Sequence, residues 1–300
     1  MSYAERLTEG GIAIFLFHGV IECRHTAVRN YTRKHLERDY FVGILRELKA
    51  RGNAMSMDGL VEHHQTGRPL PSYAFTITFD DGFENNLSVA APILVDEGVP
   101  ATFYVTTDFI DHNRMSWIDR IGYVIELAPR GTLQLPWGRR GFHDDEGKRA
   151  LLDDIRLHVK ASAKIDADGL AGDVQRQLGF PEIRSSEDPL DRKMTWEGVR
   201  QLAQQDGFTV GGHSHTHAIL SFLDDDALVA EVGASQRLLA EKAGLPCRHY
   251  SYPEGLAHCY SDSVIAVLKA HGVLCCPTAE DGINAPPLAD LFHLRRITVV

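Results

Sequence analysis

Short, continuously apolar runs recur along the chain, and each is followed by a segment with helical periodicity. Two of the clearest runs are residues 74–79 (AFTITF) and 101–106 (ATFYVT). Strands that are apolar on both faces are typical of a parallel sheet with helices on both sides, so we expect an α/β fold. The expected strands are residues 12–18, 74–79, 101–106, 208–212, 248–252, 272–276 and 294–300.

The number of these strand–helix units indicates a closed or nearly closed β/α barrel, related to the TIM barrel. The helical stretch at 225–244 begins at Asp225, which is suited to an N-cap, and ends at Gly244, as helices commonly do. The helical stretches include residues 41–52, 87–98, 195–207 and 225–244.

Residues 107 to about 195 depart from this alternation. They contain three amphipathic stretches and no convincing strand between them. We therefore predict one domain, residues 1–300, whose barrel carries a helical insertion at about 107–195.

Composition narrows the class of protein further. The formal net charge of −10 argues against a general nucleic-acid binder, because phosphate backbones favour positive surfaces. The N-terminal residues lack the pattern of a signal peptide, and no segment approaches the length of a membrane span. Five cysteines without a spaced framework suggest reduced thiols. We accordingly expect a cytoplasmic protein of unknown oligomeric state.

Two adjacent carboxylates follow one of the apolar runs. Asp80 and Asp81 stand between the strand expected at 74–79 and Gly82, whose freedom at positive φ allows a tight turn. In β/α barrels functional groups gather where strands end. One carboxylate can bind a metal ion while its neighbour acts as a general base, because the cation offsets their repulsion. Taken alone, DDG is more often only a turn.

Three histidines lie together in VGGHSHTH, residues 210–217, past another expected strand end. His213 and His217 are four apart, which puts both side chains on one side of either a helical turn or an extended chain. Two histidines, a carboxylate and a position left to water form a common catalytic zinc arrangement. His215 is an alternative ligand, since His-x-His is also a zinc spacing, whereas an isolated His-x3-His is more often two surface histidines.

His18 and the turn YPEG, residues 252–255, follow two further expected strand ends. Polar groups from four separate strands would therefore meet at one rim of the barrel. The combination predicts a divalent-metal site, with zinc favoured, at which water is activated for hydrolysis at neutral pH.

The stretches TFDDG, HSHTH and YSYPEG, with VPATFYV and the closing LRRITV, resemble the motifs of the polysaccharide deacetylase family, the NodB-homology or carbohydrate esterase family 4 proteins. The resemblance implies a distorted (β/α)7 barrel and metal-dependent hydrolysis of an N-acyl, usually N-acetyl, amide on a sugar. It also implies that Asp80 is the base acting on a metal-bound water, and that the YPEG turn forms a groove wall in which the Glu254 N–H helps to hold the oxyanion. The implied metal ligands are Asp81, His213 and His217, and the implied substrate-binding residues are Tyr252, Pro253, Glu254 and Gly255.

The chain departs from the family pattern at three points. Ser251 stands where an arginine often supports the catalytic aspartate, Glu254 stands where an aromatic residue is usual, and the late leucine-x-histidine motif is not evident. We hypothesise that Arg296, at the end of the last expected strand, replaces the missing arginine beside Asp80.

The general acid is the open assignment. His18 is expected either to act as acid or substrate contact, or to serve only as a structural histidine. His258 and His293 are weaker candidates for the acid.

The sequence says less about the residues that bind the substrate than about the metal site. Arg24, Arg29, Arg33, Lys34 and Arg38 could hold the phosphate of a nucleotide-linked or lipid-linked sugar, although a solvated loop is the simpler interpretation. Within the insertion, the aromatic residues that could stack on a sugar ring are Trp117, Tyr123 and Trp137, although amphipathic spacing favours core packing for Tyr123.

Three functions remain open at this point. The first is a metal-dependent carbohydrate N-deacetylase, a hydrolase of linear amide C–N bonds that acts on an N-acylated sugar or cytoplasmic glycan precursor. The second is an amidohydrolase of the same fold acting on a non-sugar amide or a formyl group. The third is a catalytically silent carbohydrate-binding or scaffold protein.

Overall fold

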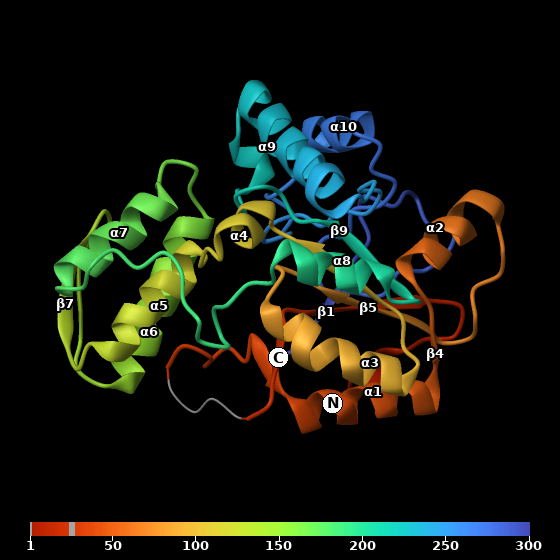
Figure 1. The fold of residues 1–300 in the computed structure, drawn as a ribbon, viewed down its shortest axis with the longest axis horizontal. Helices are drawn as coiled ribbons and strands as arrows, with labels where there is room; N and C mark the ends of the chain where they lie inside the picture. The colour runs from red at the N-terminus through yellow and green to blue at the C-terminus, as the bar shows by residue number, and fades with distance from the viewer. Residues whose placement is uncertain (1, 24–27) are drawn as a thin grey trace.

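The computed structural model describes residues 2–23 and 28–300, and its centre is a parallel β-sheet surrounded by helices (Figure 1). The strands follow the spatial order β10 (Ile297–Thr298), β1 (Ile12–Phe17), β5 (Ala74–Phe79), β6 (Ala101–Val105) and β9 (Phe208–Gly212). A further short strand, β4 (Asn53–Ala54), pairs with β5. All of these pairs are parallel, as the continuously apolar runs predicted.

Beyond β9 the barrel closes through isolated parallel bridges rather than regular ladders. Gly212 N donates to His249 O at 2.9 Å, and Tyr250 N donates to Cys275 O at 2.9 Å. The ring returns to β10 where Arg296 N donates to Glu280 O at 3.0 Å. The strands expected at 248–252 and 272–276 are therefore reduced to isolated bridges, and the fold is a distorted β/α barrel.

Helices cover the outside of this ring. Phe17, Phe79 and Phe103 stack on adjacent strands, and Phe17 and Phe79 both contact Phe41 of the first helix, so these rings face outward. Because side chains alternate along a strand, the residue after Phe79 points into the barrel. The covering helices are α1 (Arg38–Arg51), α2 (Met57–Thr66), α3 (Ala91–Glu97), α8 (Trp196–Gln204), α9 (Asp225–Leu238) and α10 (Asp262–Ala270).

The ends of α9 illustrate how local sequence sets these elements. The side chain of Asp224 caps the helix by accepting a hydrogen bond from Ala227 N at 2.9 Å. A π-helical turn, Leu239–Ala243, extends the helix to Gly244, which adopts φ = 71°. The helix therefore ends where the sequence predicted, and its N-cap, Asp224, lies one residue before the expected stretch.

Residues between the short helix α4 (Thr107–His112) and α8 form a separate lobe beside the barrel, at the left of Figure 1. The lobe has its own cluster of buried apolar side chains. Its elements are α5 (Trp117–Leu127), β7 (Gly131–Leu135), β8 (Gly138–Phe142), α6 (Asp145–Lys160) and α7 (Ala167–Gln177).

The expectation that this segment contains no strand was wrong. β7 and β8 form an antiparallel hairpin with Leu133, Leu135 and Phe142 buried under it. The alternation spans only five residues per strand, which is too short to stand out between longer helical patterns. A second small sheet, also unexpected, pairs β2 (Gly19–Ile21) with β3 (His35–Glu37).

The two ends of the described chain lie side by side. Tyr3, in a 3-10 turn at Tyr3–Arg6, donates from its hydroxyl to Val300 O at 3.2 Å. Among the described residues no helix combines the length and apolar character that crossing a membrane requires.

Candidate active site

The carboxyl ends of the barrel strands open into a cavity of about 350 Å³. One side of this cavity is formed by strand-end residues and the other by the insertion. Its charged and aromatic lining includes His18, Lys34, Asp80, Asp81, Trp117, Arg156, Lys160, His213, His217, Tyr252, Glu254 and Arg296. The structure thus brings together most of the residues that the sequence placed at strand ends.

The turn after β5 presents both aspartates to this cavity. Asp81 and Gly82 adopt φ = 75° and 77°, in the left-handed region. A Cβ atom at Gly82 would lie 2.9 Å from the Cδ1 of Ile110, so both backbone conformation and space favour glycine there. Asp80 and Asp81 are each only 3 % exposed. Two buried, adjacent carboxylates therefore require compensating cations.

Backbone strain collects around this cavity. Among the described residues, seven non-glycine residues have positive φ, and four of them belong to the motif loops: Asp81, Ser214, His217 and Glu254. Such conformations cost of order 1–3 kcal/mol each and are found preferentially at functional sites. The two histidines are therefore joined by a strained turn, neither helical nor extended.

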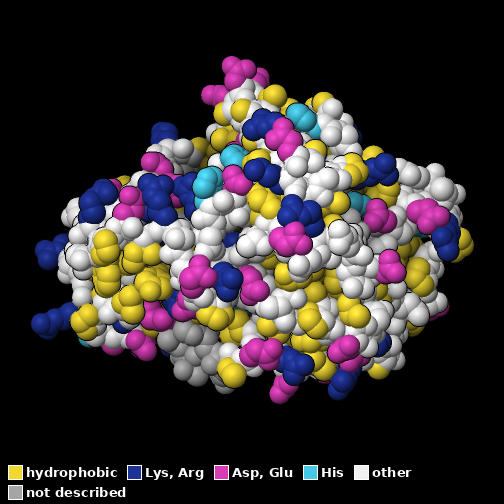
Figure 2. Space-filling view, viewed as in Figure 1, with side chains coloured by type: hydrophobic (Ala, Val, Ile, Leu, Met, Phe, Trp, Pro, Cys, Tyr) yellow, Lys and Arg dark blue, Asp and Glu magenta, His cyan; other side chains and the backbone are white. Residues whose placement is uncertain are grey.

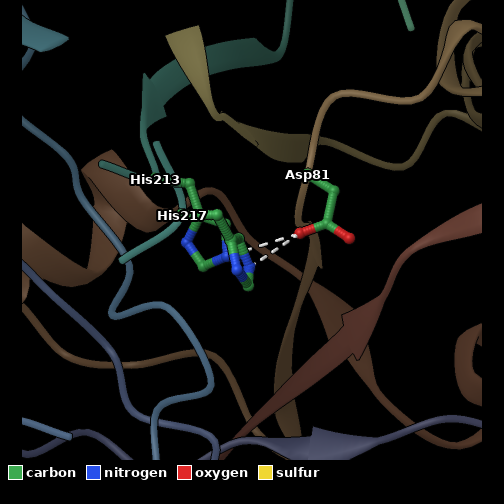
Figure 3. A group of neighbouring side chains, drawn as sticks. All are labelled: Asp81, His213 and His217. Atoms are coloured by element: carbon green, nitrogen blue, oxygen red, sulfur yellow. Dashed lines mark ion pairs between the residues drawn. The ribbon is translucent and has the colours of Figure 1, made fainter. Parts of the chain in front are cut away.

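His213, His217 and Asp81 converge on one point (Figure 3). The Nε2 atoms of His213 and His217 lie 3.5 and 3.3 Å from Asp81 Oδ1, and the candidate ligand atoms are all within 4.8 Å of one another. Asp81 Oδ1 is buried and has no hydrogen-bond partner among the described residues. A buried acceptor left without a donor, facing two imidazole nitrogens, fits a divalent cation.

Ser251 fixes the orientation of His213. The Nδ1 of His213 lies 2.9 Å from Ser251 O, and because a carbonyl only accepts, Nδ1 carries the proton. Burial lowers the pKa of His213, which leaves Nε2 with a free lone pair toward Asp81. A hydrogen bond from one ring nitrogen to a backbone carbonyl, with the other ring nitrogen left for the metal, is typical of metal-binding histidines. For His217, burial lowers the pKa but the interaction with the nearby Asp81 carboxylate outweighs it, so the net shift is upward.

Asp80 is held by Arg296. The guanidinium donates from Nη1 to Oδ1 and from Nη2 to Oδ2, both at 2.8 Å, and its Nε donates to Thr278 O at 2.6 Å. Ser251 Oγ adds a hydrogen bond to Asp80 Oδ1 at 3.2 Å. Burial raises the pKa of Asp80, but Arg296 and His213 outweigh it and the net shift is downward. The structure places Arg296 in the contact that the sequence hypothesis required.

Asp81 has a different cation. Lys34 Nζ lies 3.0 Å from Asp81 Oδ2 and 3.4 Å from Asp119 Oδ2. Burial lowers the pKa of Lys34, but the two carboxylates outweigh it and raise the pKa overall. The pKa of Asp81 is held well below its usual range, because Lys34 and His217 outweigh the cost of burial. Sequence reasoning counted Lys34 among surface basic residues and missed this role.

The YPEG turn contributes two residues to the cavity lining. Tyr252 is buried and donates from its hydroxyl to Phe292 O at 3.1 Å, and Glu254 pairs with Lys160 of the insertion at 2.5 Å. Pro253 and Gly255 do not line the cavity; a Cβ atom at Gly255 would lie 2.6 Å from Ala279 N, so its role is to let two backbones meet.

His18 lines the cavity, and burial lowers its pKa to about 4. The other candidate histidines are placed elsewhere. His215 contacts the Thr107 hydroxyl at 2.9 Å, His258 contacts Lys160 O at 3.0 Å, and His293 contacts Asp290. His215 is therefore not part of the ligand cluster.

Most of the basic residues at 24–38 have structural partners. Arg29 is nearly buried among Glu126, Asp188 and Asp191, Arg33 lies over the ring of Tyr40, and Arg38 pairs with Glu22. Arg24 lies outside the described residues. Of the residues in this group that the structure describes, only Lys34 reaches the cavity.

The insertion places one of its three candidate aromatic residues at the site. Trp117, the first residue of α5, lines the cavity. Trp137 stacks on His158 and bonds Asp154, and Tyr123 packs against the apolar cluster of the insertion.

Residues 67–275, more than half of the chain, match the family model described as polysaccharide deacetylase. No curated protein matches the chain.

Several solved structures share the fold at low sequence identity. A Streptococcus pyogenes deacetylase, PplD, determined in complex with acetate, aligns over 98 % of this chain and 94 % of its own, with 16 % identity and a TM-score of 0.62. IcaB from Ammonifex degensii aligns over 98 % and 94 %, with 15 % identity and a TM-score of 0.60. The BpsB deacetylase domain from Bordetella bronchiseptica aligns over 97 % and 96 %, with 17 % identity and a TM-score of 0.59. The chain belongs to the polysaccharide deacetylase family.

Proposed function

We propose that the protein is a divalent-metal-dependent hydrolase that removes an N-acyl group, with acetyl as the first candidate, from a sugar. The observation that carries the proposal is the convergence of Asp81 Oδ1 with two imidazole Nε2 atoms, next to a second carboxylate bound by Arg296. Two nitrogen donors and one carboxylate form a ligand set that suits zinc. Family membership supports the sugar as substrate class.

Asp81, His213 and His217 would hold the metal. When bound, a metal of this kind supplies a Lewis acid that lowers the pKa of water and polarises the acyl carbonyl. The protein's own contribution is to keep the Asp81 carboxylate ionised and the His213 imidazole neutral, and to place a base beside them.

Asp80 is the proposed base, and its free acceptor site is on Oδ2. Arg296 takes one acceptor site on each carboxylate oxygen, and Ser251 takes a further one on Oδ1. Oδ2 therefore keeps spare capacity, and it is also the oxygen 3.9 Å from His213 Nε2. We expect the proton of the attacking water to move to Asp80 Oδ2, while Arg296 keeps the carboxylate oriented.

Two further residues would act on the substrate. The backbone N–H of Glu254 has no acceptor among the described residues and is the proposed donor to the developing oxyanion. His18, neutral at neutral pH because burial lowers its pKa to about 4, is better suited to a substrate hydrogen bond than to the release of a proton.

The first test is the metal content of purified wild type beside His217→Ala, measured by elemental analysis together with acetate release from N-acetylated hexosamines. The expected result is near-stoichiometric metal and acetate release in the wild type, both lost in His217→Ala. His215→Ala is the matched control, because His215 lies on the same loop outside the ligand cluster. A wild type without metal after zinc loading would favour the catalytically silent interpretation. A metal-bound wild type that spares sugars and hydrolyses small formamides would favour the non-sugar amidohydrolase.

A further inference from the structure

The lining of the cavity contains more basic than acidic side chains, whereas the whole chain contains more acidic than basic ones. The face in Figure 2 mixes basic and acidic side chains, and the chain carries a net charge of −10. The cavity lining instead contains four cations and three carboxylates. The cations are Lys34, Arg156, Lys160 and Arg296, and the carboxylates are Asp80, Asp81 and Glu254.

Each of the three carboxylates already has one cation. Asp80 pairs with Arg296 at 2.8 Å, and Asp81 pairs with Lys34 at 3.0 Å. Glu254 pairs with Lys160 at 2.5 Å. Three ion pairs therefore use three of the four cations and leave one.

The remaining cation is Arg156, on α6 of the insertion. It is half-buried and forms no ion pair with a carboxylate in the described ranges, residues 2–23 and 28–300. Its partner is Tyr31, whose ring lies 5.2 Å from the guanidinium carbon and whose hydroxyl donates to Asp153 and accepts from Arg156 Nη1. One of five N–H donors is thus used by a described residue, and the planar fork remains available for a ligand.

We infer that the substrate carries an anionic group, a phosphate or a carboxylate, which Arg156 binds while the N-acyl group lies at the Asp81, His213 and His217 cluster. This inference rests on the proposed function and specifies its substrate class. Guanidinium forks bind carboxylate and phosphate oxygens in pairs, and such hydrogen bonds are stronger than neutral ones. A metal at the cluster would add to the positive excess of the cavity.

The volume of the cavity limits the distance between the N-acyl group and the anionic group of the substrate. A volume of about 350 Å³ is near the lower end of the range for small-molecule sites, which corresponds to one sugar unit rather than a long chain. Trp117, on the same insertion side as Arg156, also lines the cavity and is an aromatic residue on which such a ring could stack. The anionic group is therefore expected on the acylated sugar itself or on the atom that links it.

The test compares three probes with the zinc-loaded protein: N-acetylglucosamine, N-acetylglucosamine 1-phosphate and N-acetylmuramic acid, which carries a carboxylate. Acetate release gives KM for each, and calorimetric titration gives Kd independently of turnover. We expect the wild type to bind at least one anionic probe more tightly than the neutral sugar. In Arg156→Gln this preference should fall by about 10- to 100-fold, the scale of one charge-assisted hydrogen-bond pair.

Arg46→Gln is the matched control, since it removes the same charge from an exposed position on α1 and should leave the preference intact. Preference for the phosphate or for the carboxylate probe would support the inference and identify the source of the charge. Equal Kd values for neutral and anionic probes in the wild type, or an unchanged preference in Arg156→Gln, would overturn it. Failure of the proposed function has a separate signature, namely no acetate from any probe with metal bound.

Discussion

The two sides of the cavity use charge in different ways. In the barrel wall, defined as Asp80, Asp81, His213, His217 and Arg296, Asp80 is paired with Arg296 of the same wall. Asp81 is paired with Lys34, from the loop before β3. The insertion wall, defined as Trp117, Ile118, Arg156 and Lys160, reaches the cavity from a lobe with its own apolar cluster. The barrel wall thus holds the candidate metal-ligand cluster, whereas the insertion wall adds the guanidinium of Arg156 and the aromatic side chain of Trp117. Changes to the first should alter the chemistry, and changes to the second should alter substrate choice.

The largest effect that separates the two walls is expected at Arg296. Arg296→Ala would leave Asp80 buried and unpaired, which costs about 3–5 kcal/mol of unfolding free energy. Arg296→Lys keeps the charge but loses the two-pronged contact, so we expect kcat to fall by roughly 10²-fold, the scale for losing one positioned electrostatic group. The measurements are denaturant unfolding and steady-state kinetics, with metal content as the readout of the neighbouring ligands.

Retained metal with lost turnover in Arg296→Lys would agree with a positioning role beside the base. Turnover equal to that of the wild type would show that the ion pair serves only to stabilise the barrel, and the distinction between the walls would then weaken.

A smaller loss of stability is expected at Lys34. In the metal-free protein Lys34 is the cation nearest to Asp81 Oδ2, so Lys34→Met should lower the unfolding free energy by about 3 kcal/mol. A bound divalent cation would then take over the compensation of Asp81. We therefore expect zinc to raise the Tm of Lys34→Met by more than that of the wild type, in scanning calorimetry with and without zinc.

Lys49→Met is a suitable control for the Lys34 experiment because Lys49 pairs with Glu97 at the protein surface. An equal rise in Tm for wild type and Lys34→Met would contradict the assignment of Lys34 as a partner of the metal site.

The smallest effect is expected at the ion pair between Lys160 of the insertion and Glu254 of the YPEG turn. Lys160 and Glu254 are partly exposed, so Lys160→Met should change the unfolding free energy by less than about 1 kcal/mol. Metal content should stay the same, because neither residue belongs to the ligand cluster. A double-mutant cycle with Glu254→Gln isolates the pair, and loss of metal in Lys160→Met would mean that the insertion also controls the reactive centre.

The barrel wall could be predicted from the sequence because its determinants are local. Asp80, His213 and the YPEG turn each follow a short apolar run, and the end of a buried strand is a local property that the pattern of residues reveals. The contact of Arg296 with Asp80 was instead a hypothesis from the family pattern, in which an arginine often stands at the position of Ser251. The roles of these residues in catalysis stay predictions.

The insertion wall could not be predicted in the same way. Arg156 stands on an amphipathic helix, and only the packing of the lobe against the barrel turns that residue toward the cavity. The pairing of Lys34 with Asp81 depends likewise on a loop brought in from the start of the chain. The hairpin at β7 and β8 was missed because its alternation is short, and strand pairing beyond β9 consists of single bridges that have no periodic signal.

The pair of Asp80 and Arg296 joins positions 216 residues apart in the sequence. Closing so long a loop has a large entropic cost, and the contact depends on β10, a strand of only two residues that pairs with β1. β10 is therefore expected to exchange its amide hydrogens sooner than β5 or β9, which carry the ligand cluster. We therefore expect a folding intermediate in which Asp81, His213 and His217 are in place but Arg296 does not yet contact Asp80. The same species is expected to form first when the native state partly unfolds.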